Sequence, residues 1–183
     1  MEEYPSLNRT MTELDSVDWE ILDILQNDAT TPNKEIAARV GVAPSTCLER
    51  IRRLRSAGVI SAIRAVIDPE AIGRGVQAFL AIQIRPHSRE TANDFARQAL
   101  DLPETIALYN VAGGDDYLVH VAVTDSAALQ SLIIDRMLAI QQVAHCRTQL
   151  IFGEPWTSVI QRSDSAGPAS RRGRRGGSRR RAR

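Results

Sequence analysis

The chain has 183 residues, of which 43% are hydrophobic and 25% charged, and its formal net charge is +1. No apolar run approaches the roughly 20 residues that cross a bilayer, and the N-terminus lacks the basic and apolar segments of a signal peptide, so we expect a cytoplasmic protein with no membrane partner. The two cysteines and three histidines show no zinc spacing, and we expect neither a metal nor a cofactor.

The first predicted helix covers residues 14–27 and follows a flexible N-terminus, residues 1–12. Asp15 or Ser16 can cap this helix. Its apolar residues recur at helical spacing and are Leu14, Val17, Ile21, Ile24 and Leu25.

A second short helix is predicted over residues 32–40. Thr31 can cap it, and Pro32 suits its first position. Gly41 ends it, and only about three residues separate it from the next apolar-periodic stretch. Two short helices joined by a tight turn with glycine are typical of a helix-turn-helix, here about residues 33–52.

Residues 43–58 predict a third helix with two distinct faces. Its apolar face docks on a small core, whereas hydroxyls and guanidinium groups on the other side suit phosphates and base edges in the major groove. The predicted DNA-binding residues are Ser45, Thr46, Glu49, Arg50, Arg52 and Arg53. We expect Arg53→Ala to reduce preference for the cognate site more than it reduces non-specific binding. An ordinary solvated helix is the alternative for this pattern taken alone.

Residues 59–67 are rich in β-branched side chains and predict a strand or short hairpin, which would make the module a winged helix-turn-helix over residues 13–67. A three-helix protein-binding module is the alternative. Residues 68–74 contain an Asp-Pro turn signal and predict a hinge.

The periodicity then changes, and residues 75–156 predict a second domain. Its expected elements, in chain order, are a strand at 77–85, a helix at about 88–101 capped by Ser88, strands at 105–112 and 116–124, a helix from Ser126 to about Leu138, and a strand at 143–152. This β-α-β-β-α-β order is ferredoxin-like, so the fold class is α+β. Because helices cover only one face, we expect a second subunit to cover the apolar opposite face with Leu118, His120 and Ala122.

Residues 157–183 predict a disordered tail. Residues 163–183 contain eight arginines and one aspartate, so they carry a charge of +7, and residues 1–162 carry −6. This tail either anchors the protein on DNA phosphates without sequence preference or is a dispensable extension.

Residues 13–156 resemble the Lrp/AsnC (feast/famine) family of transcription regulators. Three segments carry the resemblance: residues 14–22, the stretch from Pro44 to Leu54 followed by Gly58-Val59-Ile60, and residues 111–118. The resemblance implies an N-terminal winged helix-turn-helix and a C-terminal ligand-sensing (RAM) domain. It also implies homodimers that assemble further, commonly to octamers, and a response to an amino acid or related metabolite bound at a subunit interface.

The resemblance also indicates the effector-binding residues, in the turn after the second strand of the sensing domain. They are Tyr109, Asn110, Gly113, Gly114, Asp115, Asp116 and Thr148. Gly113 and Asp116 match the family's turn, whereas Gly114 and Asp115 depart from it. A second departure is Ala43 before the third helix, where the family usually has a capping serine.

Two other functions are compatible with this layout. The first is an architectural, nucleoid-associated protein with little sequence preference. The second is a siroheme decarboxylase-like enzyme, which would need histidine and arginine around a tetrapyrrole. Candidates for that role are His87, His120, His145, Arg85 and Arg147. We expect a regulator and not an enzyme, because such an enzyme has no need of arginines on the third helix.

Overall fold

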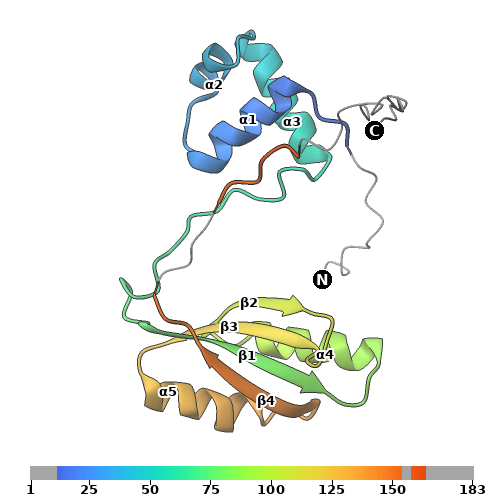
Figure 1. The fold of residues 1–183 in the computed structure, drawn as a ribbon, viewed down its shortest axis with the longest axis vertical. Coiled ribbons are helices and arrows are strands. Elements are labelled where there is room, and N and C mark those ends of the chain that lie inside the picture. Colours follow the sequence, from blue (N-terminus) through green and yellow to red (C-terminus); the bar gives the residue numbers. More distant parts are fainter. Residues whose placement is uncertain (1–11, 154–157, 164–183) are drawn as a thin grey trace, which may run out of the picture. The chain divides into compact units, whose positions relative to one another are not determined.

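The computed structural model describes residues 12–153 and 158–163. The described residues form two compact units. One comprises 12–64 together with 158–163, and the other comprises 65–153 (Figure 1). Within the described residues, no helix is long and apolar enough to span a membrane.

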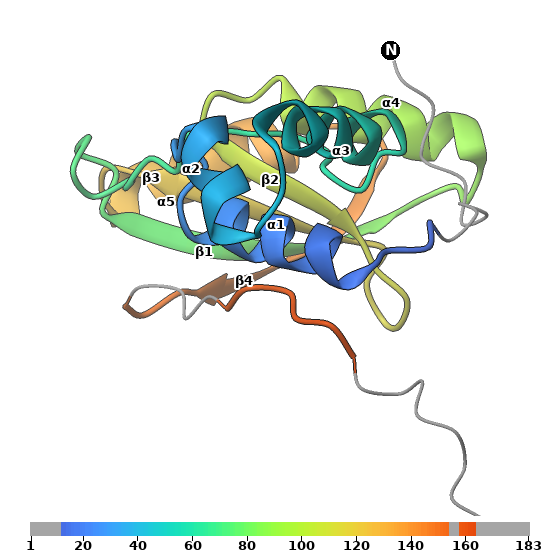
Figure 2. The ribbon, with the colours of Figure 1, turned by 90° about the horizontal axis from the view of Figure 1, so that it is seen from above.

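The first unit is a bundle of three helices, α1 (Ser16–Asn27), α2 (Asn33–Arg39) and α3 (Pro44–Ser56), which lie close together in Figure 2. Its core combines apolar side chains from all three, and these are Ile21, Leu22, Ile36, Ala37, Val40, Cys47, Ile51 and Leu54. Gly41 adopts a φ of +72° in the turn between α2 and α3, a conformation that favours glycine. The predicted helix-turn-helix is therefore confirmed.

Two details of the helix starts differ from the sequence expectation. Asp15 caps α1, since its carboxylate accepts the Asp18 N–H at 2.8 Å. Pro32, and not Thr31, is the N-cap of α2, because Pro32 is extended and its carbonyl accepts the first helical hydrogen bonds.

The wing expected over residues 59–67 is not formed as a strand. Residues 61–68 have no regular secondary structure, and Val66 is 98% exposed. A strand needs a neighbour to exchange backbone hydrogen bonds with, and strand pairing in the described part of the chain involves only the sheet of the second unit. The β-branched composition is therefore not sufficient for a strand here.

The second unit is a four-stranded antiparallel sheet with helices packed on one face. Its elements are β1 (Val76–Ile84), α4 (Arg89–Leu100), β2 (Thr105–Asn110), β3 (Tyr117–Val123), α5 (Ser126–Ser131) with η1 (Leu132–Met137), and β4 (Val143–Leu150). The strand order is β2-β3-β1-β4, with every neighbouring pair antiparallel. The ferredoxin-like α+β prediction is confirmed.

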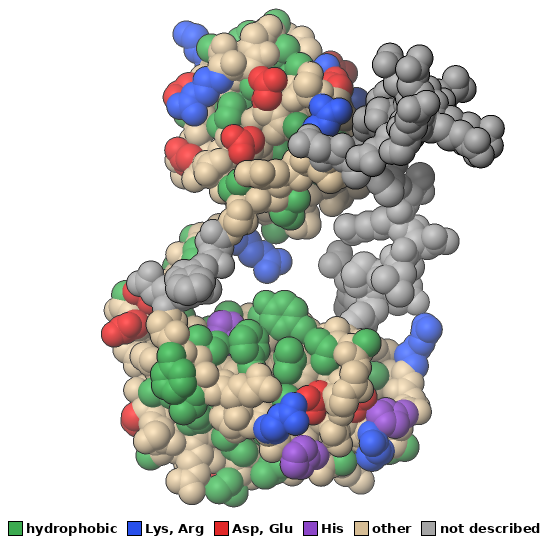
Figure 3. All heavy atoms as spheres, in the orientation of Figure 1, with side chains coloured by type: hydrophobic (Ala, Val, Ile, Leu, Met, Phe, Trp, Pro, Cys, Tyr) green, Lys and Arg blue, Asp and Glu red, His purple; other side chains and the backbone are tan. Residues whose placement is uncertain are grey.

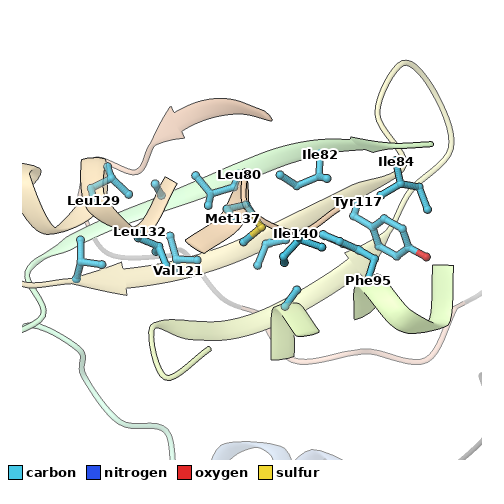
Figure 4. Packing of buried hydrophobic residues seen from close by; sticks show 14 residues of the cluster. Leu80, Ile82, Ile84, Phe95, Tyr117, Val121, Leu129, Leu132, Met137 and Ile140 are labelled. Carbon is cyan, nitrogen blue, oxygen red and sulfur yellow. The ribbon is translucent and has the colours of Figure 1, made fainter. Parts of the chain in front are cut away.

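The core of this unit lies between the sheet and its helices (Figure 4). Alternate residues of β1 and β3 point into it, as predicted, together with Phe95 of α4 and Met137 of η1. The N-cap of α5 is Asp125, one position before the predicted cap Ser126. The Asp125 carboxylate accepts the Ala128 N–H at 2.8 Å. The predicted helix also finishes as the π-helical turn η1 and not as a continuous α-helix.

Candidate functional site

Helix α3 presents a polar face away from the core of its unit. Cys47, Ile51 and Leu54 are buried, and burial raises the pKa of the Cys47 thiol. The exposed polar residues are Ser45, Thr46, Glu49, Arg52 and Arg53, with Arg55 and Ser56 at the end of the helix. The helix begins without a side-chain cap, since Ala43 occupies the N-cap position and Pro44 the first turn.

Arg50 and Arg53 of α3 bind a buried carboxylate on α1. The Asp18 side chain has no exposed surface, and its two oxygens accept hydrogen bonds from Arg50 Nη1 at 2.9 Å and from Arg53 Nη2. Arg50 also donates to Asp15 at 2.7 Å. A buried carboxylate is costly unless it is paired, so this network holds the polar face of α3 at a fixed position against α1.

The network shifts the ionisation of its exposed members. The Asp18 backbone N–H, followed by the Arg50 guanidinium, lowers the pKa of the Asp15 carboxyl. The carboxylates of Asp15 and Asp18 raise the pKa of Arg50. These directions indicate that Asp15 and Arg50 stay charged in the folded unit.

Sequence reasoning missed the partner of these arginines. Asp18 is one position beyond Val17 and three before Ile21, so it lies on the half of α1 that faces inward. Helical periodicity places this carboxylate on the inward face, three residues after the Asp15 cap. That placement was the available sign that Asp18 needs a cationic partner. Arg53 was expected to contribute to sequence preference, and its guanidinium is paired with Asp18, although about half of its side chain is exposed.

The turn after β2 is held by backbone and side-chain hydrogen bonds. Gly113 has a φ of +139°, a backbone conformation that residues other than glycine rarely adopt. The Asp116 carboxylate accepts the Ile84 N–H at 2.8 Å, and Gln83 Nε2 donates to the Gly114 carbonyl at 2.7 Å. These contacts fix the turn against the end of β1.

Charged side chains gather at this end of the sheet. Asp115 accepts a 2.6 Å hydrogen bond from Arg147 of β4, and its second oxygen, Oδ1, is buried without a hydrogen-bond partner among the described residues. Arg85 and His87 lie 3.8 and 3.7 Å from the Asp116 carboxylate. Figure 3 shows Arg, Asp and His side chains together on this part of the surface.

Thr148 lies apart from the turn within one chain. It pairs with Leu80 on the helix-covered side of the sheet, on the β4 edge. Tyr109 is on the β2 edge and pairs with Leu118, on the opposite face, and Asn110 is its exposed neighbour. The predicted effector residues are therefore not brought together by a single chain.

The face of the sheet without helices carries an apolar and aromatic surface. Phe79 packs against His120 with ring centroids 5.0 Å apart and against Tyr109 at 6.5 Å. His120 also contacts Gln77 Oε1 at 3.1 Å, and burial lowers the pKa of its imidazole. Hydrophobic side chains gather over the sheet in Figure 3.

Comparisons with known proteins identify the two units separately. The family model of the AsnC-type helix-turn-helix domain matches residues 14–55, and that of the Lrp/AsnC ligand binding domain matches residues 77–159. A curated relative, the HTH-type transcriptional regulator AldR of Mycolicibacterium smegmatis, is 39% identical over 140 residues, which cover 76% of this chain and 82% of that protein. This chain belongs to the Lrp/AsnC family. It is a transcriptional regulator with a DNA-binding helix-turn-helix and a ligand-binding domain.

Other members of the Lrp/AsnC family match over nearly their whole length. The leucine-responsive regulatory protein of Rhizobium meliloti is 33% identical over 138 residues, covering 75% of this chain and 88% of that one. A solved transcriptional regulator from Neisseria meningitidis, in complex with L-Met, has a TM-score of 0.74 at 30% identity and covers 81% and 96% of the two chains. Escherichia coli AsnC has a TM-score of 0.72 at 25% identity, covering 81% and 99%.

Proposed function

We propose that α3 reads operator DNA through Ser45, Thr46, Glu49 and Arg52. The supporting observation is their exposure on the side of α3 opposite Cys47, Ile51 and Leu54, on a helix that follows a tight turn. Hydroxyls can contact phosphates or bases, glutamate can accept from cytosine, and arginine pairs with guanine. Arg50 and Arg53 act by positioning α3, with Arg53 in reach of DNA through its exposed half.

The effector is an amino acid or a closely related metabolite, bound beside the turn of residues 111–116. Asp115 supports this assignment, because its Oδ1 can accept from a ligand ammonium group while the other oxygen pairs with Arg147. Thr148 joins such a site only if a second chain supplies it, since Thr148 and the turn of residues 111–116 lie on different parts of the sheet in one chain. The relative solved with L-Met binds a ligand of this class.

The protein works as a homodimer or larger oligomer, octameric as the family resemblance implied, with the helix-free sheet face covered by a second copy. The apolar surface around Phe79, Tyr109 and His120 supports this, because soluble proteins seldom leave such a surface in water. It acts on chromosomal DNA in the cytoplasm as a regulator and not as an enzyme. If the purified protein carried a bound tetrapyrrole, it would absorb visible light strongly. Such absorption would favour the siroheme decarboxylase-like enzyme over the regulator.

The experiment is recovery of genomic fragments by a chain lacking residues 164–183 at physiological salt. A shared, palindromic motif is expected, and addition of single amino acids should change the affinity for that motif. Enrichment without any shared motif would contradict sequence-specific regulation and favour the architectural function.

A further inference from the structure

The segment after the sensing domain returns to the DNA-binding unit. The Gln26 side chain, in the last turn of α1, donates to the Ile160 carbonyl at 3.1 Å and accepts the Ile160 N–H at 2.8 Å. A pair of hydrogen bonds to one residue's backbone fixes position and direction without requiring a particular side chain there. We call residues 158–163 the strap.

The strap lies along a hollow beside α1 and the end of α2. The hollow is lined by Trp19, Glu20, Asp23, Ile24, Arg39 and Val40, with Ile160, Gln161 and Arg162 from the strap itself. Arg162 thus shares this hollow with the acidic Glu20 and Asp23, which have the complementary charge. No described residue of α3 lines the hollow, and Thr46, Glu49 and Arg52 on the polar face of α3 are exposed.

The DNA-binding unit carries little positive charge of its own. Residues 12–64 contain seven Lys and Arg against eight Asp and Glu. Three of the seven cations, Arg39, Arg50 and Arg53, pair with carboxylates inside the unit. Attraction of DNA phosphates is the main source of sequence-independent affinity, and this unit supplies little of it.

A segment rich in positive charge, which residues 12–64 lack, follows the strap in the sequence. Residues 164–183 contain eight arginines and one aspartate. Twenty residues can extend at most about 70 Å, which is enough to pass around a small helical domain and follow DNA beside it. Because the strap is fixed on α1, these arginines start from the DNA-binding unit and not from the end of the sensing domain.

We propose that the strap anchors the arginine-rich C-terminus to the helix-turn-helix, so that one DNA molecule is bound by α3 and by the tail together. This inference rests on the DNA-binding function proposed above. The strap raises the effective concentration of the arginines near phosphates that flank the site, and the gain requires both the anchor and the charge.

Amide hydrogen exchange of the full chain tests the anchor. In the native protein, the Ile160 N–H should be protected, because it donates to Gln26. Gln26→Ala should remove that protection, and the control Asn27→Ala, which removes a side-chain hydrogen bond to Asp23 in the same helix turn, should not. An unprotected Ile160 N–H in the native chain would refute the anchor.

A double-mutant cycle on DNA binding tests the coupling. Gln26→Ala should weaken binding of the full chain to a duplex several-fold and leave a chain without residues 164–183 unchanged. Deleting the tail should make the dependence of log affinity on log salt shallower. An equal effect of Gln26→Ala with and without the tail, or no effect in either, would overturn the proposal. Loss of preference for the recovered motif in the tailless chain would instead count against α3 as the reading helix.

Discussion

The buried Asp18 carboxylate of α1 accepts a 2.9 Å hydrogen bond from Arg50 of α3. Two helices that approach each other through an apolar core could still slide or rotate slightly. A charge pair with a fixed fork geometry removes that freedom, because guanidinium groups bind carboxylates along defined directions. Arg53 shares the same carboxylate, so two consecutive turns of α3 are attached to one point of α1.

Asp18→Asn should therefore destabilise the helix-turn-helix by about 2 kcal/mol, since two charge-assisted hydrogen bonds are weakened in a buried position. Urea unfolding followed by circular dichroism measures this. Asp23→Asn, an exposed carboxylate of the same helix, is the control and should change stability by less than about 0.5 kcal/mol. Equal stability of the two variants would show that the Asp18 network contributes nothing.

Ala43→Ser should stabilise the protein by about 0.5–2 kcal/mol. The α3 N-cap is extended and has no side-chain hydrogen bond, and a serine hydroxyl there can accept an N–H of the first turn. Thermal unfolding measures the gain, with Ala57→Ser at the other end of α3 as the control. A loss of stability in Ala43→Ser would mean that the cap geometry is unsuitable.

We expect His120 to make the stability of the sheet unit sensitive to acid. Burial lowers the pKa of its imidazole below the ordinary 6.5, so the unfolded chain takes up a proton at a higher pH than the folded one. Stability should be complete above pH 6.5 and fall as the pH drops through 6.5 towards the folded pKa. The urea midpoint of the native chain should thus be lower at pH 5.5 than at pH 7.5.

His120→Gln should remove most of that difference, whereas His145→Gln, at an exposed position of β4, should retain it. Identical pH dependence in the native chain and His120→Gln would assign the effect to another group.

Gly113 and Gly114 differ in what they tolerate. Alanine at Gly113 must adopt a φ near +139°, which costs of the order of 1–3 kcal/mol, whereas Gly114 has no positive φ and open space around its Cβ position. Gly113→Ala should lower the thermal unfolding temperature and Gly114→Ala should not.

Gly113→Asp should abolish the response to the effector while operator binding remains. A normal response to the effector in this variant would place the effector site elsewhere.

Much of the fold was predictable because its elements carry strong periodic patterns. The alternation from Ala78 to Ile84 and the stripe on α3 each have a single compatible arrangement. The prediction of a wing strand was wrong because a strand depends on a pairing neighbour, and residues 61–68 have none among residues 12–153 and 158–163. The strap was unpredictable for a similar reason, since Gln26 and Ile160 are 134 residues apart and a backbone contact leaves no pattern in the sequence.

The site was only partly predictable. Helical spacing identified which α3 residues are exposed, but it could not show that Arg50 and Arg53 already have a partner. Likewise, the turn at Gly113 was evident from its residues, whereas the distance of Thr148 from it follows only from the strand order. Tertiary pairing, and not local propensity, decides both.

The most direct measurement compares native and Arg52→Ala chains, both lacking residues 164–183, on the recovered motif and on a shuffled duplex of equal length. We expect Arg52→Ala to lose roughly 1–3 kcal/mol of binding free energy on the motif, much less on the shuffled duplex, and to leave the unfolding temperature unchanged. Equal losses on both duplexes would make Arg52 a phosphate contact. No loss on either would contradict the claim that the exposed face of α3 reads the DNA.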